Sequence, residues 1–311
     1  MQTQRDVRNR IGSIKNIQKV TRAMELVAAA RLRRAEQRIA NLRPYAGAIR
    51  RMTRQAAEAA GTEAGRLPLM RQHDSEDHVG LLLVTGDRGL AGAFNSQILR
   101  AGERAAHELS SESMRVSWYV SGRRGASSLV FRGHELTGSY AGFTDRPAYA
   151  DARHIADDLM TAYIDDQIDR VDIIYNHYIS PLTQRVTREV LLPLQEAAVL
   201  EGDDKDADGE GGGDRDGETH GAPEHRALVE YEPGPEEILR RLIPDYVEIS
   251  IFRALLESTA SEHGARMTAM RNASENAGEL IEDLTLEMNR ARQAEITQEI
   301  MEVVAGAESL T

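Results

Sequence analysis

A glycine-rich turn at residues 86–92 (GDRGLAG) is the first place in the chain where chemistry could be performed. It follows an apolar run typical of a buried strand and precedes a helical pattern, which is where phosphate-binding loops lie. However, its spacing is not G-x-G-x-x-G, it contains no lysine, and no G-x-x-x-x-G-K-[ST] motif occurs anywhere in the chain. We interpret the segment as a tight turn whose small residues let a helix pack on a sheet, and we expect no nucleotide binding.

Patterns that could hold a metal ion or a nucleophile also fail on spacing. Residues 204–209 (DKDADG) match the first half of an EF-hand loop, but the twelfth position, which requires a bidentate Glu, is Arg215. The nine histidines show no His-Glu-x-x-His spacing, and no Ser stands in a nucleophile elbow. Because the chain has no Cys, disulfides and thiolate metal sites are excluded. We expect no catalytic residues, no metal and no cofactor.

The strongest local charge lies in residues 1–34, where nine basic and two acidic residues give a net charge of +7. Such a run is compatible with a solvated helix face, or with binding to an acidic protein surface, RNA or anionic lipid. No aromatic residue is interleaved to stack on bases, and the whole chain has a formal net charge of −12. Nucleic acid is therefore not the expected partner.

The composition is typical of long exposed helices, because only 5% of residues are aromatic while 28% are charged. The N-terminus has no apolar signal core, and the longest apolar runs, such as residues 79–84, are far too short to span a membrane. We expect a soluble intracellular protein that something else must hold at any membrane where it works.

The first 60 residues predict one long helix, from about Gln4 to Ala60, which would extend roughly 80 Å at 1.5 Å per residue. Its apolar positions recur three and four apart, with a shift of one residue after Val27. The predicted seam is Val7, Ile11, Ile14, Ile17, Val20, Met24 and Val27, then Ala28, Leu32, Ala35, Ile39, Leu42, Ala46 and Ile49.

The end of the chain predicts a second long helix, from residue 236 to about Ala305, in which Pro244 should introduce a kink or a restart. Its apolar positions include Leu242, Val247, Leu255, Leu256, Met267, Met270, Ala277, Ile281, Leu284, Met288 and Ala291. Two long apolar stripes each need a partner. The simplest solution is an antiparallel two-helix coiled coil formed by residues 1–60 and 236–311, connected by residues 228–235.

Between these helices, residues 75–200 predict a small α/β domain with a mainly parallel sheet. Strands are expected at residues 79–84, 115–120, 171–178 and 185–192, and helices at 95–109, 124–131 and 150–164. Residues 201–227 contain ten acidic and three basic residues and almost no apolar ones. We interpret this segment as a disordered acidic insert, since it cannot bury enough apolar surface to fold.

Three motifs stand in order along the chain. They are residues 14–29 (IKNIQKVTRAMELVAA) with 43–45 (RPY), residues 85–95 (TGDRGLAGAFN), and residues 261–267 (SEHGARM) with 289–304 (NRARQAEITQEIMEVV). They resemble the opening helix, the first strand-turn-helix and the closing helix of the gamma subunits of F-type ATP synthases. The similarity covers the whole chain except the acidic insert, and the absence of a transit peptide and of a Cys-bearing regulatory segment favours the bacterial members.

The resemblance implies that the coiled coil is a shaft inside a ring of alternating alpha and beta subunits. It implies that the α/β domain is a foot, docked with epsilon on the c-subunit ring of a complex that also contains delta. The chain would be peripheral, on the cytoplasmic side of the cell membrane. It would couple proton flow to ATP synthesis in the beta subunits without being catalytic itself, by biasing their conformational equilibria.

The same resemblance implies particular contact residues. Arg292, Gln293 and Thr297 match the family's contact to a catch loop of the beta subunit, and Met24 matches the position facing the mobile beta arm. Arg266 matches a neighbouring basic contact on the closing helix. Tyr231 and Glu232 match the region that touches the c ring, although the acidic insert stands just before them.

Two other classes of protein remain compatible with the residues alone. One is a free-standing coiled-coil scaffold, which would self-associate through its seam, and the other is an RNA-binding protein that uses the basic N-terminal stripe. Co-purification distinguishes them, because a rotor subunit should emerge with alpha and beta subunits and with little RNA.

Overall fold

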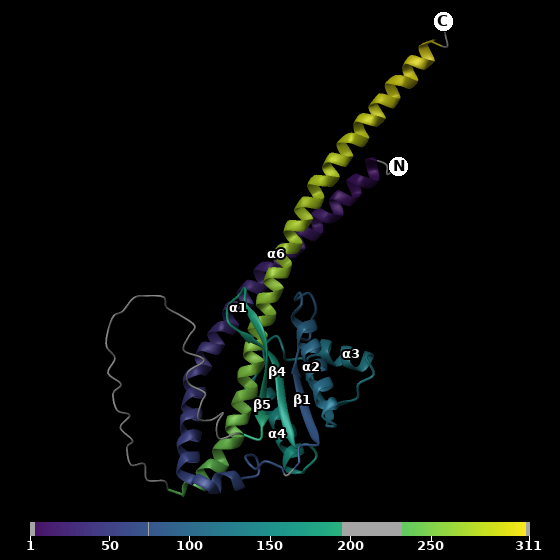
Figure 1. The fold of residues 1–311 in the computed structure, drawn as a ribbon. Coiled ribbons are helices and arrows are strands. Elements are labelled where there is room, and N and C mark those ends of the chain that lie inside the picture. The colour runs from purple at the N-terminus through teal and green to yellow at the C-terminus, as the bar shows by residue number, and fades with distance from the viewer. Residues whose placement is uncertain (1–3, 74, 195–231, 309–311) are drawn as a thin grey trace, which may run out of the picture. The chain divides into compact units, whose positions relative to one another are not determined.

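The computed structural model describes residues 4–73, 75–194 and 232–308 (Figure 1). Side-chain burial is described up to residue 301. The chain divides into two compact units. The helical unit comprises residues 1–31, 90–92 and 263–311, and the sheet unit comprises residues 32–89 and 93–262. Both long helices contribute a segment to each unit.

The two predicted long helices are confirmed. Helix α1 (Gln4–Ala60) has 57 residues and contains Pro44, and helix α6 (Pro235–Glu308) has 74 residues and contains Pro244. The predicted restart at Pro244 is wrong, because the helix continues through it. A proline removes one backbone hydrogen bond. The buried neighbours Ile243 and Val247 hold this turn of α6 against the core of the sheet unit, which offsets that loss.

The sheet unit is built on a five-stranded sheet in the order β3-β2-β1-β4-β5. Strands β1 to β4 are parallel, and β5 is antiparallel to β4. The strands are β1 (His78–Val84), β2 (Arg115–Ser121), β3 (Leu136–Tyr140), β4 (Arg170–Tyr178) and β5 (Gln184–Leu192). The helices are α2 (Phe94–Ser111), α3 (Arg123–Phe131) and α4 (Tyr149–Ile164), with a short 3-10 helix η1 (Gly61–Arg66). The predicted mainly parallel α/β sheet is thus confirmed, although β3 and η1 were not predicted.

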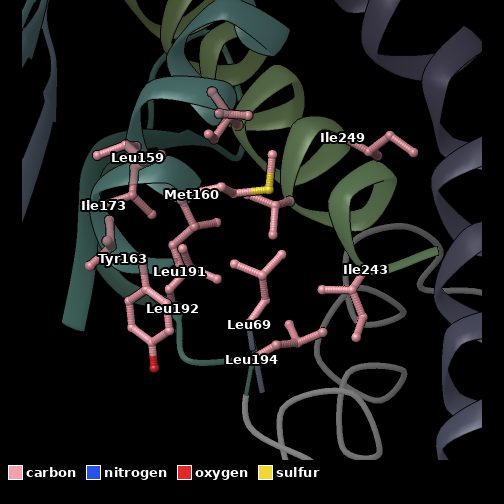
Figure 2. Packing of buried hydrophobic residues seen from close by; sticks show 14 of the residues in the cluster. Leu69, Leu159, Met160, Tyr163, Ile173, Leu191, Leu192, Leu194, Ile243 and Ile249 are labelled. Carbon is pink, nitrogen blue, oxygen red and sulfur yellow. The ribbon is translucent and has the colours of Figure 1, made fainter. Parts of the chain in front are cut away.

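The interior of the sheet unit lies on the face of the sheet covered by α4 and by segments of α1 and α6. Figure 2 shows side chains from α4, β5 and α6 pointing into this interior, among them Met160, Leu192 and Ile243. The backbone N–H of Leu194 donates to the carbonyl of Leu69 (3.0 Å), which joins the segments that precede β1 and follow β5. Helix α2 packs on the opposite face. The sheet is therefore covered on both sides, as parallel sheets require.

In the helical unit, α1 and α6 pack antiparallel, because Ile11 clusters with Leu284 while Gln18 contacts Ser274. An uninterrupted three-and-four spacing describes the seam of α1, whose members are all buried or half-buried: Val7, Ile11, Ile14, Gln18, Thr21, Glu25 and Ala28. Met24 is half-buried as well but lies outside this spacing. The seam of α6 passes through the predicted positions from Met270 to Met288.

The predicted seam of α1 was wrong at three positions. Ile17, Val20 and Val27 are 55, 58 and 53% exposed. The strict heptad spacing places Gln18, Thr21 and Glu25 in the seam instead, so no shift of one residue occurs after Val27. Polar side chains can occupy these positions because they find hydrogen-bond partners across or along the seam.

Candidate functional site

The carboxylate of Asp87, in the turn after β1, is bound by groups of the chain itself. Asp87 accepts hydrogen bonds from the backbone N–H groups of Arg123 (3.1 Å), Gly142 (2.9 Å) and Thr144 (3.3 Å), and from the Thr144 hydroxyl (3.0 Å). The Arg123 N–H lies at the N-terminus of α3, where an anion is favoured. This internal anion supports the prediction that the turn is structural.

Burial alone would raise the pKa of Asp87, but the hydrogen bonds from Arg123, Thr144 and Gly142 outweigh it and hold the pKa below its ordinary value of 3.8. The carboxylate is thus ionised at neutral pH. Next to it, Gly122 has φ 98°, and a Cβ there would lie 2.3 Å from the carbonyl oxygen of Thr85. Only glycine fits this close approach of β1 and the start of α3.

The crevice at the carboxyl ends of β1 and β4 is where ligands bind in open α/β sheets, since the strand order reverses there. In this protein α6 fills it. The Ser258 hydroxyl donates to the carbonyl of Val84 at the end of β1 (3.3 Å), and the Ser261 hydroxyl donates to the carbonyl of Asn176 on β4 (3.1 Å). The usual ligand position of this fold is therefore taken by a helix of the same chain.

A buried ion-pair network ties β4 to β5 at the other end of these strands. Asp172 is fully buried and accepts from Arg170 (2.9 Å) and from Arg188 (2.7 Å). Each arginine also pairs with an exposed carboxylate: Arg170 with Glu76 at 3.0 Å, and Arg188 with Glu108 at 3.2 Å. Its hydrogen bond to Asp172 raises the pKa of Arg170, although burial opposes the shift. We interpret this network as structural.

Among residues 4–73, 75–194 and 232–308, no group of three or more His, Cys, Asp or Glu is placed to hold a metal ion. A candidate surface lies instead on the helical unit. Around the polar part of the seam, a recess of about 390 Å³ is lined by Gln18, Arg22, Glu25, Arg271, Ser274, Glu275 and Gly278. Gln18 Nε2 donates to the Ser274 carbonyl (3.2 Å), and Arg271 Nε donates to Glu25 Oε1 (3.0 Å).

An exposed apolar stripe, formed by Ile17, Val20 and Val27, lies beside this polar part of the seam on α1, while the exposed Leu26 lies on the other side of the seam. Met24, a predicted contact residue, is half-buried on the same stretch of helix. Arg266, the other predicted contact here, is only 8% exposed, and its Nη1 lies 3.3 Å from Nδ1 of His263. The three exposed side chains of the stripe make this face of α1 a candidate contact surface.

The last described part of α6 carries the remaining predicted contacts. Arg292, Gln293 and Thr297 are all exposed, and the Thr297 hydroxyl donates to the Gln293 carbonyl (2.8 Å) within the helix. Glu232 is exposed just before α6, whereas Tyr231 and the acidic insert 201–227 lie outside the described residues. Sequence reasoning missed the polar seam residues Gln18 and Glu25, although extending the heptad spacing backward from Ala28 would have found them.

The fold defines a class of protein that combines an α/β sheet, whose usual ligand position is filled by α6, with an antiparallel pair of long helices that carries the candidate contact residues. The family described as ATP synthase matches residues 3–310. The ATP synthase gamma chain of Rubrobacter xylanophilus is 43% identical over 310 residues, which cover 100% of this chain and 99% of that one. The ATP synthase gamma chain of Streptomyces coelicolor is 41% identical and covers 97% of this chain and 94% of its own. The chain belongs to the family of ATP synthase gamma chains.

Solved structures agree with this assignment. The central stalk and c-ring structure of Tetrahymena thermophila mitochondrial ATP synthase contains a chain that is 25% identical, with a TM-score of 0.57 and coverage of 82% of this chain and 99% of that one. A chain of Euglena gracilis mitochondrial ATP synthase, 16% identical, supports the fold with a TM-score of 0.65 over 99% of this chain and 94% of its own. None of the described helices is long and apolar enough to cross a membrane.

Proposed function

We propose that this chain is the central-stalk rotor subunit of an F-type ATP synthase, which couples proton flow through the membrane sector to ATP synthesis in the beta subunits. Its partners are the alpha, beta and epsilon subunits and the c ring, in a complex that also contains delta. The chain is non-catalytic, binds no nucleotide or nucleic acid, and is peripheral on the cytoplasmic side of the cell membrane. Gamma chains at about 40% identity over their full length support this proposal.

One observation of the structure carries the proposal. Near the end of the described side chains, Ile296, Ile300 and Met301 are 44, 57 and 63% exposed, on a helix whose seam residues are buried or half-buried up to Met288. An apolar helix end of this kind needs a cover. An apolar sleeve suits a rotating part, because contacts with it are non-directional and change little with angle.

Directional contacts belong just below that end. We assign Arg292, Gln293 and Thr297 to a catch loop of the beta subunit, and Met24 to the mobile beta arm. The exposure of Arg292, Gln293 and Thr297, and the partial exposure of Met24, support these roles. Arg266 is assigned to the same neighbourhood, and its burial makes it the least accessible of the five.

In this proposal the long helices and the sheet domain have different roles. Residues 1–60 and 236–311 form the shaft, residues 75–200 form the foot, and residues 228–235 return the chain to the shaft after the insert 201–227. We assign Tyr231 and Glu232 to the contact with the c ring and epsilon.

The test is reconstitution of the chain with alpha and beta subunits, followed by ATPase and single-molecule rotation assays. Replacing Gln293 and Thr297 together by Ala should lower ATPase and torque tenfold or more, whereas trimming the chain from Ala305 should be mild. The matched control replaces Glu295 and Glu299 by Gln, since both are exposed and lie on the opposite side of α6. A double variant as active as wild type would overturn the catch assignment, and a wild-type chain that fails to activate the ring would overturn the function.

A further inference from the structure

A cluster of polar side chains holds α6 on the carboxyl ends of the strands. In addition to Ser258 and Ser261, the Thr259 hydroxyl lies 2.8 Å from the carbonyl of Thr144, in the loop between β3 and α4. All three hydroxyl-bearing residues are buried, and their acceptors are backbone carbonyls rather than side chains. Ser258 and Ser261 thus bond to strand-end carbonyls at two places, and Thr259 contacts the sheet unit at a third, where its single hydroxyl hydrogen is shared with the Leu255 carbonyl of α6 itself (2.8 Å).

Charged groups on the same stretch of α6 continue the cluster toward β4 and β5. Glu257 Oε2 lies 2.6 Å from Nδ1 of His177, and Arg253 Nη2 lies 2.9 Å from Glu189 Oε2. The Tyr175 hydroxyl donates to the other oxygen of Glu189 (2.7 Å). Arg253 and Glu257 also face each other along α6 at 3.9 Å. We call the contacts made by residues 253–261 of α6 the polar joint.

Before residue 253, most of the contact between α6 and the sheet unit is apolar, although the buried Glu248 lies 3.6 Å from Arg153 of α4. Leu239, Ile243, Val247 and Ile251 of α6 belong to the hydrophobic core of the sheet unit, two or more turns before the hydroxyl cluster. Apolar contacts are non-directional, so a helix held by them alone can turn or slide by a fraction of a residue at low cost. Hydrogen bonds weaken steeply with angle and distance, so the polar joint resists both movements.

The backbone geometry next to the joint leaves little room for such a movement. A Cβ on Gly86, in the turn after β1, would lie 2.8 Å from the carboxyl carbon of the buried Glu262. The turn after β1 thus packs closely against Glu262, the residue that follows Ser261 on α6. Rotation of α6 in either direction would break hydroxyl contacts or press this carboxyl group against the turn.

Building on the proposed function, we propose that the polar joint is the torque-bearing connection through which the sheet unit turns α6. Ser258, Thr259 and Ser261 are positioning residues, which fix the angle of the helix under load. The apolar core provides most of the attraction between α6 and the rest of the sheet unit, but its contacts do not fix the rotation of α6 about its own axis. When the joint is removed, α6 slips under load, so that ATP hydrolysis continues while less work reaches the foot.

The experiment compares coupling in reconstituted, membrane-bound enzyme that contains the triple variant S258A/T259V/S261A. We expect ATPase activity without a proton gradient to stay within twofold of wild type, and the steady-state proton gradient per ATP hydrolysed to fall by half or more. The control variant carries Ser96→Ala and Ser111→Ala, which remove hydroxyls that only cap helical carbonyls at the surface of α2, and it should be fully coupled.

Thr259 provides a second comparison if the triple variant does not assemble. Thr259→Val keeps the size and removes the hydroxyl, whereas Thr259→Ser keeps the hydroxyl, so Val should reduce coupling and Ser should restore it. Full coupling in the triple variant, or equal coupling in the two single variants, overturns the proposal that these hydroxyls bear the torque. A wild-type chain that does not restore pumping overturns the proposed function instead.

Discussion

Replacing the polar part of the seam by leucine should make the helical unit more stable but should make the register between α1 and α6 less specific. The perturbation is Gln18→Leu with Glu25→Leu. Gln18 loses its hydrogen bond to the Ser274 carbonyl, worth about 1 kcal/mol. Glu25 loses an ion pair with Arg271, whose side chain is 50% exposed, so this loss is about 0.5 kcal/mol or less. Two half-buried leucines return about 1 to 1.5 kcal/mol each, which leaves a net gain of about 1 kcal/mol.

The same replacement should weaken the preference of the two helices for their native register. A slip by one heptad in the native chain would bring Gln18 opposite the apolar Ile281 and separate Glu25 from Arg271. Burying an unpaired amide costs about 2 kcal/mol, which disfavours the slipped pairing about 30-fold. With leucines at both positions this penalty disappears, because apolar seams accept several registers.

Disulfide trapping measures the register directly, since the native chain has no cysteine. The aligned reporter pair is Ile11→Cys with Leu284→Cys, two members of one buried cluster. The slipped reporter pair is Ile11→Cys with Ala291→Cys. We expect the slipped disulfide to become at least tenfold more abundant in the leucine variant, while hydrogen exchange in residues 7–28 slows.

The control variant places leucine at Val20 and Val27, which are exposed beside the seam, and it should leave the register unchanged. A leucine variant that forms the slipped disulfide as rarely as the native chain would refute the reasoning. So would faster hydrogen exchange in residues 7–28, because the apolar replacement would then be destabilising.

Three further predictions concern Asp87, Asp172 and Met24, with Glu108→Ala as the control for the second. Asp87→Asn should lower the free energy of unfolding by about 2 kcal/mol at neutral pH. Because the folded-state pKa of Asp87 is depressed, the difference from wild type should shrink only as the pH falls below about 4, which denaturant titrations at pH 7 and pH 3 would reveal. Asp172→Ala should cost about 3 kcal/mol, since it leaves two arginines without their buried partner. Glu108→Ala, at the exposed end of the same network, should cost less than 1 kcal/mol in the same titration. Met24→Lys should reduce protons pumped per ATP in inverted vesicles more than it reduces ATPase activity, and unchanged pumping would contradict the assignment of this residue to the beta arm.

The sequence predicted the long helices and most strands because their signals are local. The run at residues 79–84 is apolar on both faces, as a central parallel strand must be, and β1 is buried along nearly its whole length. Strand β3 was missed because its residues alternate between half-buried and exposed around Gly138, which suits a sheet edge but gives a weak signal. Pro244 was expected to interrupt α6, but packing against the core decides the conformation there.

The candidate sites were harder to predict because they depend on pairing across the fold. Gln18 and Glu25 look like surface residues, while Ile17 and Val20 look like seam residues, until the spacing is followed without interruption from Val7 to Ala28. Likewise, nothing local in residues 258–261 indicates that their hydroxyls bind strand-end carbonyls. These contacts join residues 174 and 85 positions apart, beyond the reach of any periodic pattern.

The pairing of the first and last helices also sets the order in which the protein can be assembled during translation. Gln18 and its partner Ser274 are 256 residues apart, so α1 leaves the ribosome long before its seam can be covered. At about 5 to 20 residues per second, the apolar positions of α1 wait roughly 13 to 50 s for α6. During that interval the nascent chain exposes an amphipathic helix that can pair with α1 of a neighbouring chain on the same messenger. The first helix therefore completes its antiparallel contacts only after the whole sheet unit has been synthesised.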